Sequence, residues 1–199
     1  MIGIIDYGAG NLHSVVKALR FLGYQTRLVT KDSDLKEVDK LILPGVGAFG
    51  QAVVELQATG LWPALNDWIR QGLPLLGVCL GMQLLMENSQ ESPGIRGFGL
   101  IRGTCSRLPA PKVPHIGWNE VHFLDSTQLF DDLQDGSCFY FVHSYSVSPE
   151  DAKLVRGITE YNLAFPSVIQ AGRVFGVQFH PEKSGEPGLL LLRNWVEKC

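Results

Sequence analysis

Short apolar runs alternate with stretches of helical spacing through the first half of the chain. Continuous apolar runs bounded by glycine or polar turns are typical of strands buried on both faces of a sheet. They occur at IGIID (2–6), KLILPG (40–45) and LPLLGVC (73–79), and QTRLVT (25–30) is predicted as a further strand. Apolar residues at helical spacing predict helices at residues 11–22, 48–58, 61–71 and 80–88.

This alternation predicts an α/β fold, with a doubly wound, mostly parallel central sheet and helices on both faces. In such sheets ligands bind beyond the carboxyl ends of the strands. Three predicted strands end there in a glycine-rich turn or a cysteine, at Gly8–Gly10, Gly45–Gly47 and Cys79. We therefore expect the functional site at this edge of the sheet.

The pattern changes after about residue 93, where apolar and polar residues alternate as in strands with one exposed face. Strands are predicted at HIGWNEVHF (115–123), CFYFVHSYSV (138–147), AKLVRGITEY (152–161) and SVIQAGRVFGVQFH (167–180). AGR (171–173) predicts a hairpin turn within the last of these, and EPGLLLLRNWVEK (186–198) a final helix. We expect added antiparallel strands within a single domain of residues 1–199, since no linker divides the chain.

Composition narrows the class of protein. The 199 residues are 45% hydrophobic and 19% charged, with a net charge of −3 and a pI near 5.9. This balance gives no basic surface for nucleic acid and no polybasic patch for a membrane. No apolar run approaches the length of a membrane span, no secretory signal is visible, and the four cysteines lack paired spacing. We therefore expect a cytoplasmic protein.

The stretch GVCLG (77–81) places Cys79 where a predicted strand meets a predicted helix. A sharp turn there pushes the central side chain outward, and small flanking residues let strand and helix approach closely. Gly77 and Gly81 fit this nucleophile elbow, with cysteine in place of serine. The helix N-terminus beside the thiol also favours its reactive thiolate form. The five letters are equally compatible with a small buried core cysteine.

A cysteine nucleophile needs a base, usually a histidine that a third group orients. His180 ends an apolar strand, so it can reach the same sheet edge as Cys79. Pro181 favours an extended backbone at His180, and residues two apart in an extended chain point to the same side. Glu182 is therefore expected to hold the imidazole and to stabilise its protonated form. The alternative is a surface turn with a casual ion pair.

The motifs GVCLGMQ (77–83) and FHPE (179–182), in this order, resemble those of the class I (triad) glutamine amidotransferases, and the resemblance covers the whole chain. It implies the fold of that family, which is flavodoxin-like. It also implies that Cys79 attacks the side-chain amide of glutamine to form a thioester, with His180 moving the protons and Glu182 orienting it. Gln83, one helical turn after Cys79, is implied as a substrate-binding residue; otherwise it is a solvated helix residue.

The resemblance assigns further positions around the substrate. Backbone N–H donors of an oxyanion hole are implied at Gly45, Val46 and Gly47 and at Leu80, and glycines let a peptide plane adopt the required orientation. The segment that holds the substrate's α-substituents corresponds to His143, Ser144 and Tyr145. The alternatives are a plain strand-to-helix turn for the glycine loop and an ordinary strand end for the second segment.

Within the family, several stretches are most similar to the glutaminase subunits of imidazole glycerol phosphate synthase: IGIIDYGAGNLHSV (2–15), LPGVGAF (43–49), PHIGWNEV (114–121), FYFVHSY (139–145) and FHPEKS (179–184). The loops typical of the anthranilate synthase and pyridoxal phosphate synthase subunits, PGPG and PGGES, are absent. The resemblance implies a heterodimer with a (β/α)₈-barrel cyclase subunit. That partner combines the ammonia with a phosphoribulosyl-formimino nucleotide and releases imidazole glycerol phosphate and an aminoimidazole carboxamide ribotide.

Four residues follow family positions near this partner: Asn11, Trp118, Tyr140 and Lys183. Each has another interpretation, as a helix cap for Asn11, core aromatics for Trp118 and Tyr140, and a solvated charge for Lys183. The remaining histidines, at positions 13, 115 and 122, show no ligand spacing and are interpreted as structural or solvated. No metal and no organic cofactor are implied.

Two other classes of protein stay open on the sequence. A peptidase or other hydrolase of similar fold also carries a cysteine elbow, although Gln83 and the HPE motif argue against it. A non-catalytic scaffold that only binds a partner is the second, and the intact set of Cys79, His180 and Glu182 argues against that.

Overall fold

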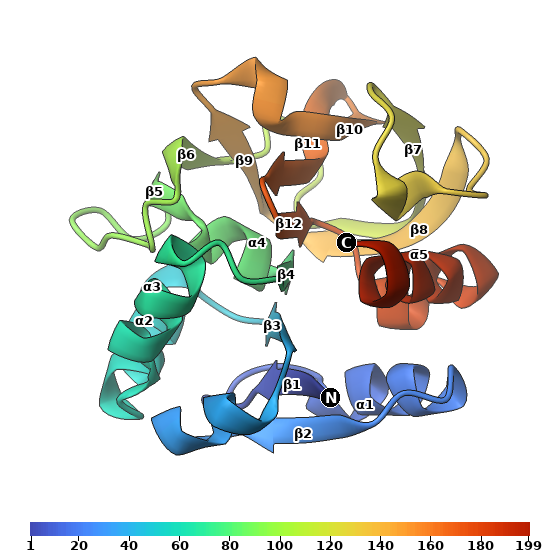
Figure 1. Ribbon diagram of the computed structural model, residues 1–199. Coiled ribbons are helices and arrows are strands. Elements are labelled where there is room, and N and C mark those ends of the chain that lie inside the picture. Colours follow the sequence, from blue (N-terminus) through green and yellow to red (C-terminus); the bar gives the residue numbers. More distant parts are fainter.

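The computed structural model describes all residues, 1–199. A nine-stranded sheet runs through the molecule in the order β2-β1-β3-β4-β12-β11-β10-β7-β8, and a small second sheet has the order β5-β6-β9 (Figure 1). The strands are β1 (Ile2–Ile5), β2 (Thr26–Val29), β3 (Lys40–Gly45), β4 (Leu75–Cys79), β5 (Met86–Ser89), β6 (Ile101–Arg107), β7 (His115–Phe123), β8 (Ser137–His143), β9 (Tyr145–Pro149), β10 (Val155–Tyr161), β11 (Leu163–Ala171) and β12 (Val174–Val177).

The large sheet is parallel in one half and antiparallel in the other. The pairs from β2 to β12 are parallel, and the pairs from β12 to β8 are antiparallel. The α/β fold with added antiparallel strands is therefore confirmed. Strand β12 comes late in the chain, yet it lies beside β4 and runs parallel to it, with Val177 opposite Val78. The ends of these two strands consequently meet at one edge of the sheet.

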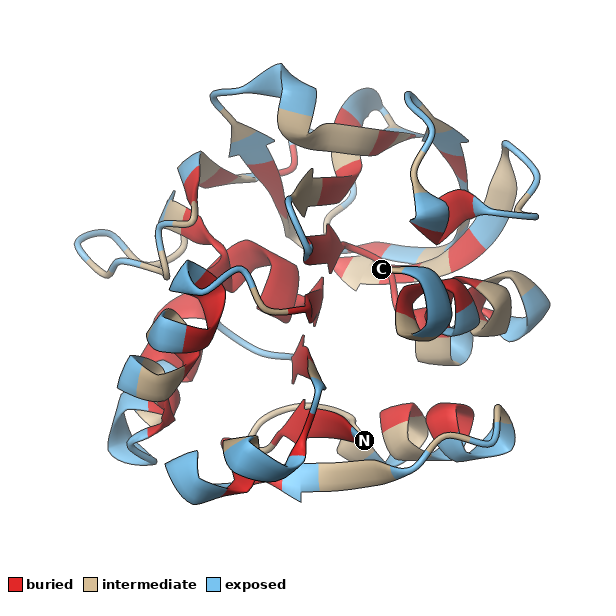
Figure 2. Cartoon of the chain, in the orientation of Figure 1, coloured by how far each residue is buried: buried red, intermediate tan, exposed pale blue.

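Helices cover both faces of this sheet. They are α1 (Leu12–Phe21), α2 (Phe49–Ala58), α3 (Leu61–Arg70), α4 (Leu80–Leu84) and α5 (Gly185–Lys198). Helices α2 and α3 lie on one face, and α1 and α5 on the other, each with its buried side toward the strands (Figures 1 and 2). Apolar side chains accordingly form two clusters of 25 and 23 buried residues. None of the helices has the length and apolar character needed to cross a membrane.

Most predicted elements are confirmed, but several have different limits. The helix predicted at 80–88 ends at Leu84, because the following residues pair as β5 with β6, where Met86 lies opposite Ile101. The strand predicted at 138–147 is interrupted at Ser144, because β8 pairs with β7 while β9 pairs with β6 in the other sheet. Residues 152–154 form a 3₁₀ turn instead of the start of a strand.

Candidate active site

Cys79 lies at a strained turn between β4 and α4. Its backbone has φ 55° and ψ −108°, a region that residues other than glycine seldom adopt. A Cβ atom at Gly81 would lie 1.8 Å from the carbonyl oxygen of Leu43, and one at Gly77 would lie 2.7 Å from the backbone of Gly81. Neither contact is possible, so both glycines are required for the close approach of strand and helix. This geometry is that of the nucleophile elbow expected from GVCLG.

His180 and Glu182 form a buried pair just beyond the end of β12. The imidazole Nδ1 lies 2.9 Å from Glu182 Oε1, and the two side chains are only 3% and 2% exposed. Their proximity was predicted, but for a partly wrong reason: His180 is extended, whereas residues 181–183 form a 3₁₀ turn. The hydroxyl of Ser184 holds this turn, donating to the His180 carbonyl and accepting from the N–H of Tyr140.

The pKa of His180 is raised to about 10. Burial alone would lower this pKa, but the neighbouring Cys79 sulfur and the Glu182 carboxylate more than reverse the effect. The structure contains no Cys79–His180 hydrogen bond, and His180 Nε2 has no partner, so this nitrogen is free to act on the sulfur or on a substrate. Because its pKa lies well above neutrality, His180 carries a proton at neutral pH. It can therefore give this proton to the leaving group of a substrate bound at Cys79.

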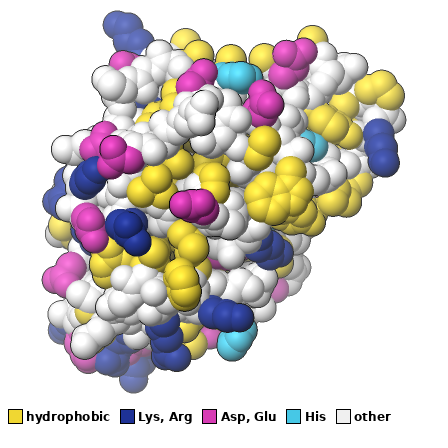
Figure 3. All heavy atoms as spheres, turned by 90° about the vertical axis from the view of Figure 1, so that its right-hand side faces the viewer, with side chains coloured by type: hydrophobic (Ala, Val, Ile, Leu, Met, Phe, Trp, Pro, Cys, Tyr) yellow, Lys and Arg dark blue, Asp and Glu magenta, His cyan; other side chains and the backbone are white.

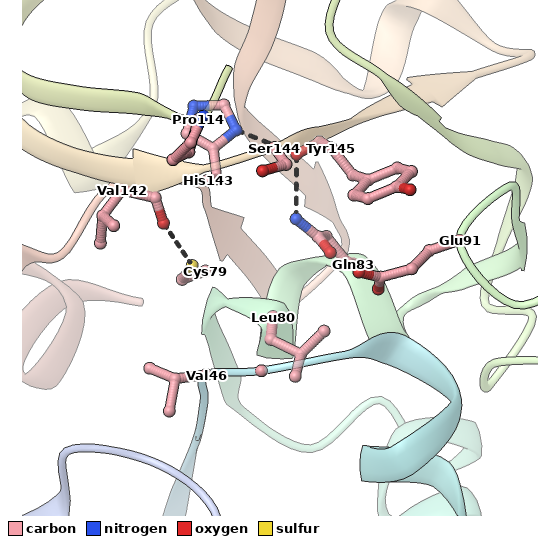
Figure 4. Close-up of a pocket in the computed structure, with 11 residues that line it drawn as sticks. Val46, Cys79, Leu80, Gln83, Glu91, Pro114, Val142, His143, Ser144 and Tyr145 are labelled. Atoms are coloured by element: carbon pink, nitrogen blue, oxygen red, sulfur yellow. Dashed lines mark hydrogen bonds between the residues drawn. The ribbon is translucent and has the colours of Figure 1, made fainter.

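A cavity of about 250 Å³ opens over Cys79 (Figure 4). Its lining includes Val46 and Gly47 from the loop after β3, Leu80 and Gln83 from α4, and the segment His143–Ser144–Tyr145. The cavity thus brings together every predicted oxyanion and substrate residue except Gly45, which is buried in β3 opposite Cys79. Gly47 has φ 96°, a conformation that strains any residue with a side chain.

Gln83 is buried beside Cys79 and is not solvated. Its amide nitrogen donates to the carbonyl of Tyr145 at 3.0 Å and to Oε1 of Gln178 at 3.2 Å. These two bonds fix the side chain in the cavity wall, and Figure 4 shows the one to Tyr145. The same Tyr145 carbonyl lies 2.9 Å from Nδ1 of His143.

Two polar residues of the site were not predicted. Gln178 is fully buried, and its amide nitrogen lies 3.7 Å from Cys79 Sγ. In the strand predicted at 167–180 it stands two residues before His180, so the spacing used for Glu182 also indicated it. Glu91 lines the cavity and accepts a 2.7 Å hydrogen bond from the N–H of Phe49 at the start of α2. It follows β5, a strand absent from the prediction, and no local motif marks it.

Three of the four predicted interface residues form one cluster on the surface. Trp118 of β7 is 59% exposed and lies edge-on to Tyr140 of β8, with 6.1 Å between ring centroids. The Lys183 Nζ lies 5.9 Å from the centre of the Tyr140 ring. Trp118 is therefore not a core residue. Figure 3 shows the side of the molecule that carries β8 and α5, where apolar side chains are exposed among charged ones. Asn11 makes no capping hydrogen bond with its side chain, so the capping interpretation is wrong.

The other histidines differ in their surroundings. His13 is exposed, and His122 lies on the surface near Glu120 and Asp135. His115 is buried and contacts His143. No group of three or more His, Cys, Asp or Glu side chains is arranged to hold a metal ion.

Comparison with known proteins agrees with this fold and site. The family profile described as glutamine amidotransferase class-I matches residues 3–199. Solved structures with the same fold include that entitled "Structure of PurLQS from Thermotoga maritima", with a TM-score of 0.78 and 18% identity over 98% of this chain and 96% of that one. A sharply turned cysteine facing a buried His–Glu pair on this fold defines a class-I glutamine amidotransferase, and the chain belongs to that family.

The curated relatives narrow the family further. A protein of Moorella thermoacetica is 49% identical over 98% of this chain and 94% of its own length, and one of Methanopyrus kandleri is 52% identical over 96% and 94%. A third, from Methanocaldococcus jannaschii, is 47% identical over 99% of both chains. All three are named imidazole glycerol phosphate synthase subunit HisH. Within the amidotransferases, the chain is thus a member of the HisH group.

Proposed function

We propose that this chain is the glutaminase subunit of an imidazole glycerol phosphate synthase. It hydrolyses L-glutamine to glutamate and ammonia at Cys79 and passes the ammonia to a cyclase subunit, in the biosynthesis of histidine. The observation that carries this chemistry is the buried His180–Glu182 pair next to the elbow cysteine. The 47–52% identity to HisH subunits over nearly the whole chain supports the choice among amidotransferases.

The reaction follows from the protonation state of the site. The Cys79 thiolate attacks the side-chain amide carbon of glutamine, and a C–S bond forms as the carbonyl oxygen becomes an oxyanion. His180 gives its Nε2 proton to the leaving nitrogen, the C–N bond breaks and ammonia departs. The now neutral His180 takes a proton from water, which attacks the thioester. The C–S bond then breaks, and glutamate leaves with His180 protonated again.

The cavity wall supplies the remaining contacts. The N–H of Leu80 and a peptide N–H of the Gly45–Val46–Gly47 loop stabilise the oxyanion. The carboxylate of Glu91 and the side-chain oxygen of Gln83 (Oε1) receive the α-ammonium group of the substrate. A carboxylate accepts several hydrogen bonds, so Glu91 keeps its bond to Phe49 while it binds this group. The segment His143–Ser144–Tyr145 borders the other side of the substrate.

The cyclase docks on the surface formed by Trp118, Tyr140 and Lys183 and also contacts Asn11, and the two chains form a heterodimer in the cytoplasm. The partner is a (β/α)₈ barrel. An exposed tryptophan packed edge-on to a tyrosine is typical of an interface anchor. This surface is directly linked to the base, because the carbonyl of Tyr140 accepts a 2.9 Å hydrogen bond from the N–H of His180.

Glutamate release by the chain, alone and with the cyclase, tests this function. The proposal expects glutamine hydrolysis that the cyclase accelerates, and no cleavage of peptides or simple esters. Peptide cleavage in place of glutaminase activity would identify a hydrolase of another kind. If the chain binds the cyclase but releases no glutamate under any condition, it is a non-catalytic scaffold.

A further inference from the structure

A chain of hydrogen bonds leads from the wall of the cavity into β7. His143 Nδ1 lies 2.9 Å from the carbonyl oxygen of Tyr145, and His143 Nε2 lies 3.1 Å from His115 Nδ1. His115 Nε2 in turn lies 3.3 Å from the amide nitrogen of Asn119. Every ring nitrogen of the two histidines thus has a partner, and none of these partners is a carboxylate.

The partners at the two ends determine the position of every proton in this series of hydrogen bonds. A carbonyl oxygen only accepts, so His143 carries its proton on Nδ1 and leaves Nε2 as an acceptor. His115 must then donate from Nδ1 to that atom. Its own Nε2 becomes the acceptor for the N–H of Asn119. Asn119 is oriented independently, because its amide also donates to the Glu160 carbonyl at 2.8 Å, and its oxygen accepts from the N–H of Glu120 at 2.9 Å.

The surroundings of the two rings keep them neutral. His115 stacks between Tyr161 and Phe141, with ring centroids 4.1 and 4.9 Å away, and Phe165 lies against both histidines. Burial lowers the pKa of His115 to about 4 and that of His143 to about 3. Both rings are therefore uncharged at neutral pH, and His143 has neither a free nitrogen nor the basicity to replace His180.

We propose that His115 and Asn119 are positioning residues for the glutamine site, which lock His143 in its Nδ1–H tautomer and so fix the Tyr145 carbonyl in the cavity wall. The inference rests on the proposed glutaminase function. The Tyr145 carbonyl accepts hydrogen bonds from both His143 and Gln83, so it joins the hydrogen bonds of the two histidines to the wall of the cavity. Gln83 also bonds Gln178, whose amide reaches Cys79 Sγ. A change of tautomer at His143 would break the first of these links.

The tautomers are tested directly by NMR on the unmodified protein. Imidazole ¹⁵N shifts and N–H couplings identify which nitrogen carries the proton. We expect the Nδ1–H form for both His115 and His143, unchanged between about pH 6 and 8, since their pKa values lie below this range. An Nε2–H form of His143, or titration of either ring in this range, would overturn the proposal.

Glutamine binding tests the positioning role without turnover. In a Cys79→Ala background, His115→Phe keeps an aromatic ring in the stack but removes the donor to His143. His115→Asn places an amide N–H near the position of Nδ1 and removes the stack. The matched control is His122→Phe, an exposed histidine on the same strand.

Calorimetric titration should show about a tenfold weaker Kd for glutamine in His115→Phe, which corresponds to about 1.4 kcal/mol. His115→Asn should restore binding to within about threefold of the parent, as should His122→Phe. Equal weakening in both His115 variants would indicate packing alone and contradict the proposal. If the Cys79→Ala protein binds no glutamine, the proposed function itself fails, and the NMR tautomers show separately whether the hydrogen-bond chain exists.

Discussion

The charge of Glu182 is the most informative single perturbation of the site. Glu182→Gln keeps the size of the side chain and an oxygen that can accept from His180 Nδ1, which lies 2.9 Å from Oε1. It removes the negative charge that stabilises the imidazolium. Because both side chains are almost fully buried, water does not screen this loss.

The magnitude follows from the geometry. Two unit charges about 4 Å apart interact by about 4 kcal/mol at an effective dielectric constant of about 20. The retained hydrogen bond recovers part of this, so the expected loss is about 2–4 kcal/mol. The pKa of His180 should therefore fall from about 10 by about 1.5–3 units, and the glutaminase rate by about 30- to 1000-fold. His180→Ala should be more damaging, and close to loss of Cys79 itself.

The pH dependence of glutamate release separates this effect from general damage. The active form needs a protonated His180, so wild-type activity should fall as pH rises through its raised pKa of about 10. In Glu182→Gln this alkaline limb should move to lower pH, since removal of the carboxylate lowers that pKa. The rates are measured in complex with the cyclase, together with Glu120→Gln, which alters an exposed histidine–glutamate pair. That control should stay within about threefold of the wild type.

Two results would refute this reasoning. An alkaline limb that stays at its wild-type position in Glu182→Gln would show that the carboxylate does not control the proton of His180. A wild-type rate in His180→Ala would require a different base, and His143 is already excluded by its two occupied nitrogens.

Three further substitutions test the elbow, the loop and the cavity. Gly81→Ala should lower the free energy of unfolding by about 3 kcal/mol or more in urea titrations, because the new Cβ meets the Leu43 carbonyl at 1.8 Å; near wild-type stability would contradict the elbow geometry. Gly47→Val and Gly23→Val, at φ 96° and 87° with open space around both, should each cost about 1–2 kcal/mol. Gly23→Val is the control, and only Gly47→Val should reduce glutamate release, by about tenfold or more. Equal rates of glutamate release in the two variants would show that the loop after β3 takes no part in the mechanism. Glu91→Gln should raise the KM for glutamine by about tenfold with a smaller change in kcat, and an unchanged KM would exclude its contact with the ammonium group.

The parts of the fold that local patterns specify were predictable from the sequence. Strands β3 and β7 have the limits that their patterns predict, because each is bounded by turn residues or a proline. Residues 80–88 were mistaken for one helix because Leu84, Leu85 and Met86 are buried on all sides, where a continuous apolar run does not distinguish helix from strand. Only pairing with the distant β6 decides their structure.

The same division holds for the site. Cys79, His180 and Glu182 lie in short motifs whose spacing carries their chemistry, and their proximity was predictable. Glu91 reaches the cavity only because β5 and β6 form a second sheet, and sequence spacing contains no trace of this. The structural interpretation of His115 agrees with its burial, but its contact with His143 depends on the pairing of β7 with β8 and could not be predicted from spacing.

We propose that Cys79 releases the ammonia that the cyclase consumes. The direct measurement is formation of imidazole glycerol phosphate by the complex that contains Cys79→Ala, with either glutamine or a high concentration of ammonium as the nitrogen source. We expect the product to form from ammonium at the wild-type rate, and none to form from glutamine. Glutamine-dependent product formation at a near wild-type rate would contradict the assignment of the nucleophile and, with it, the account of the site.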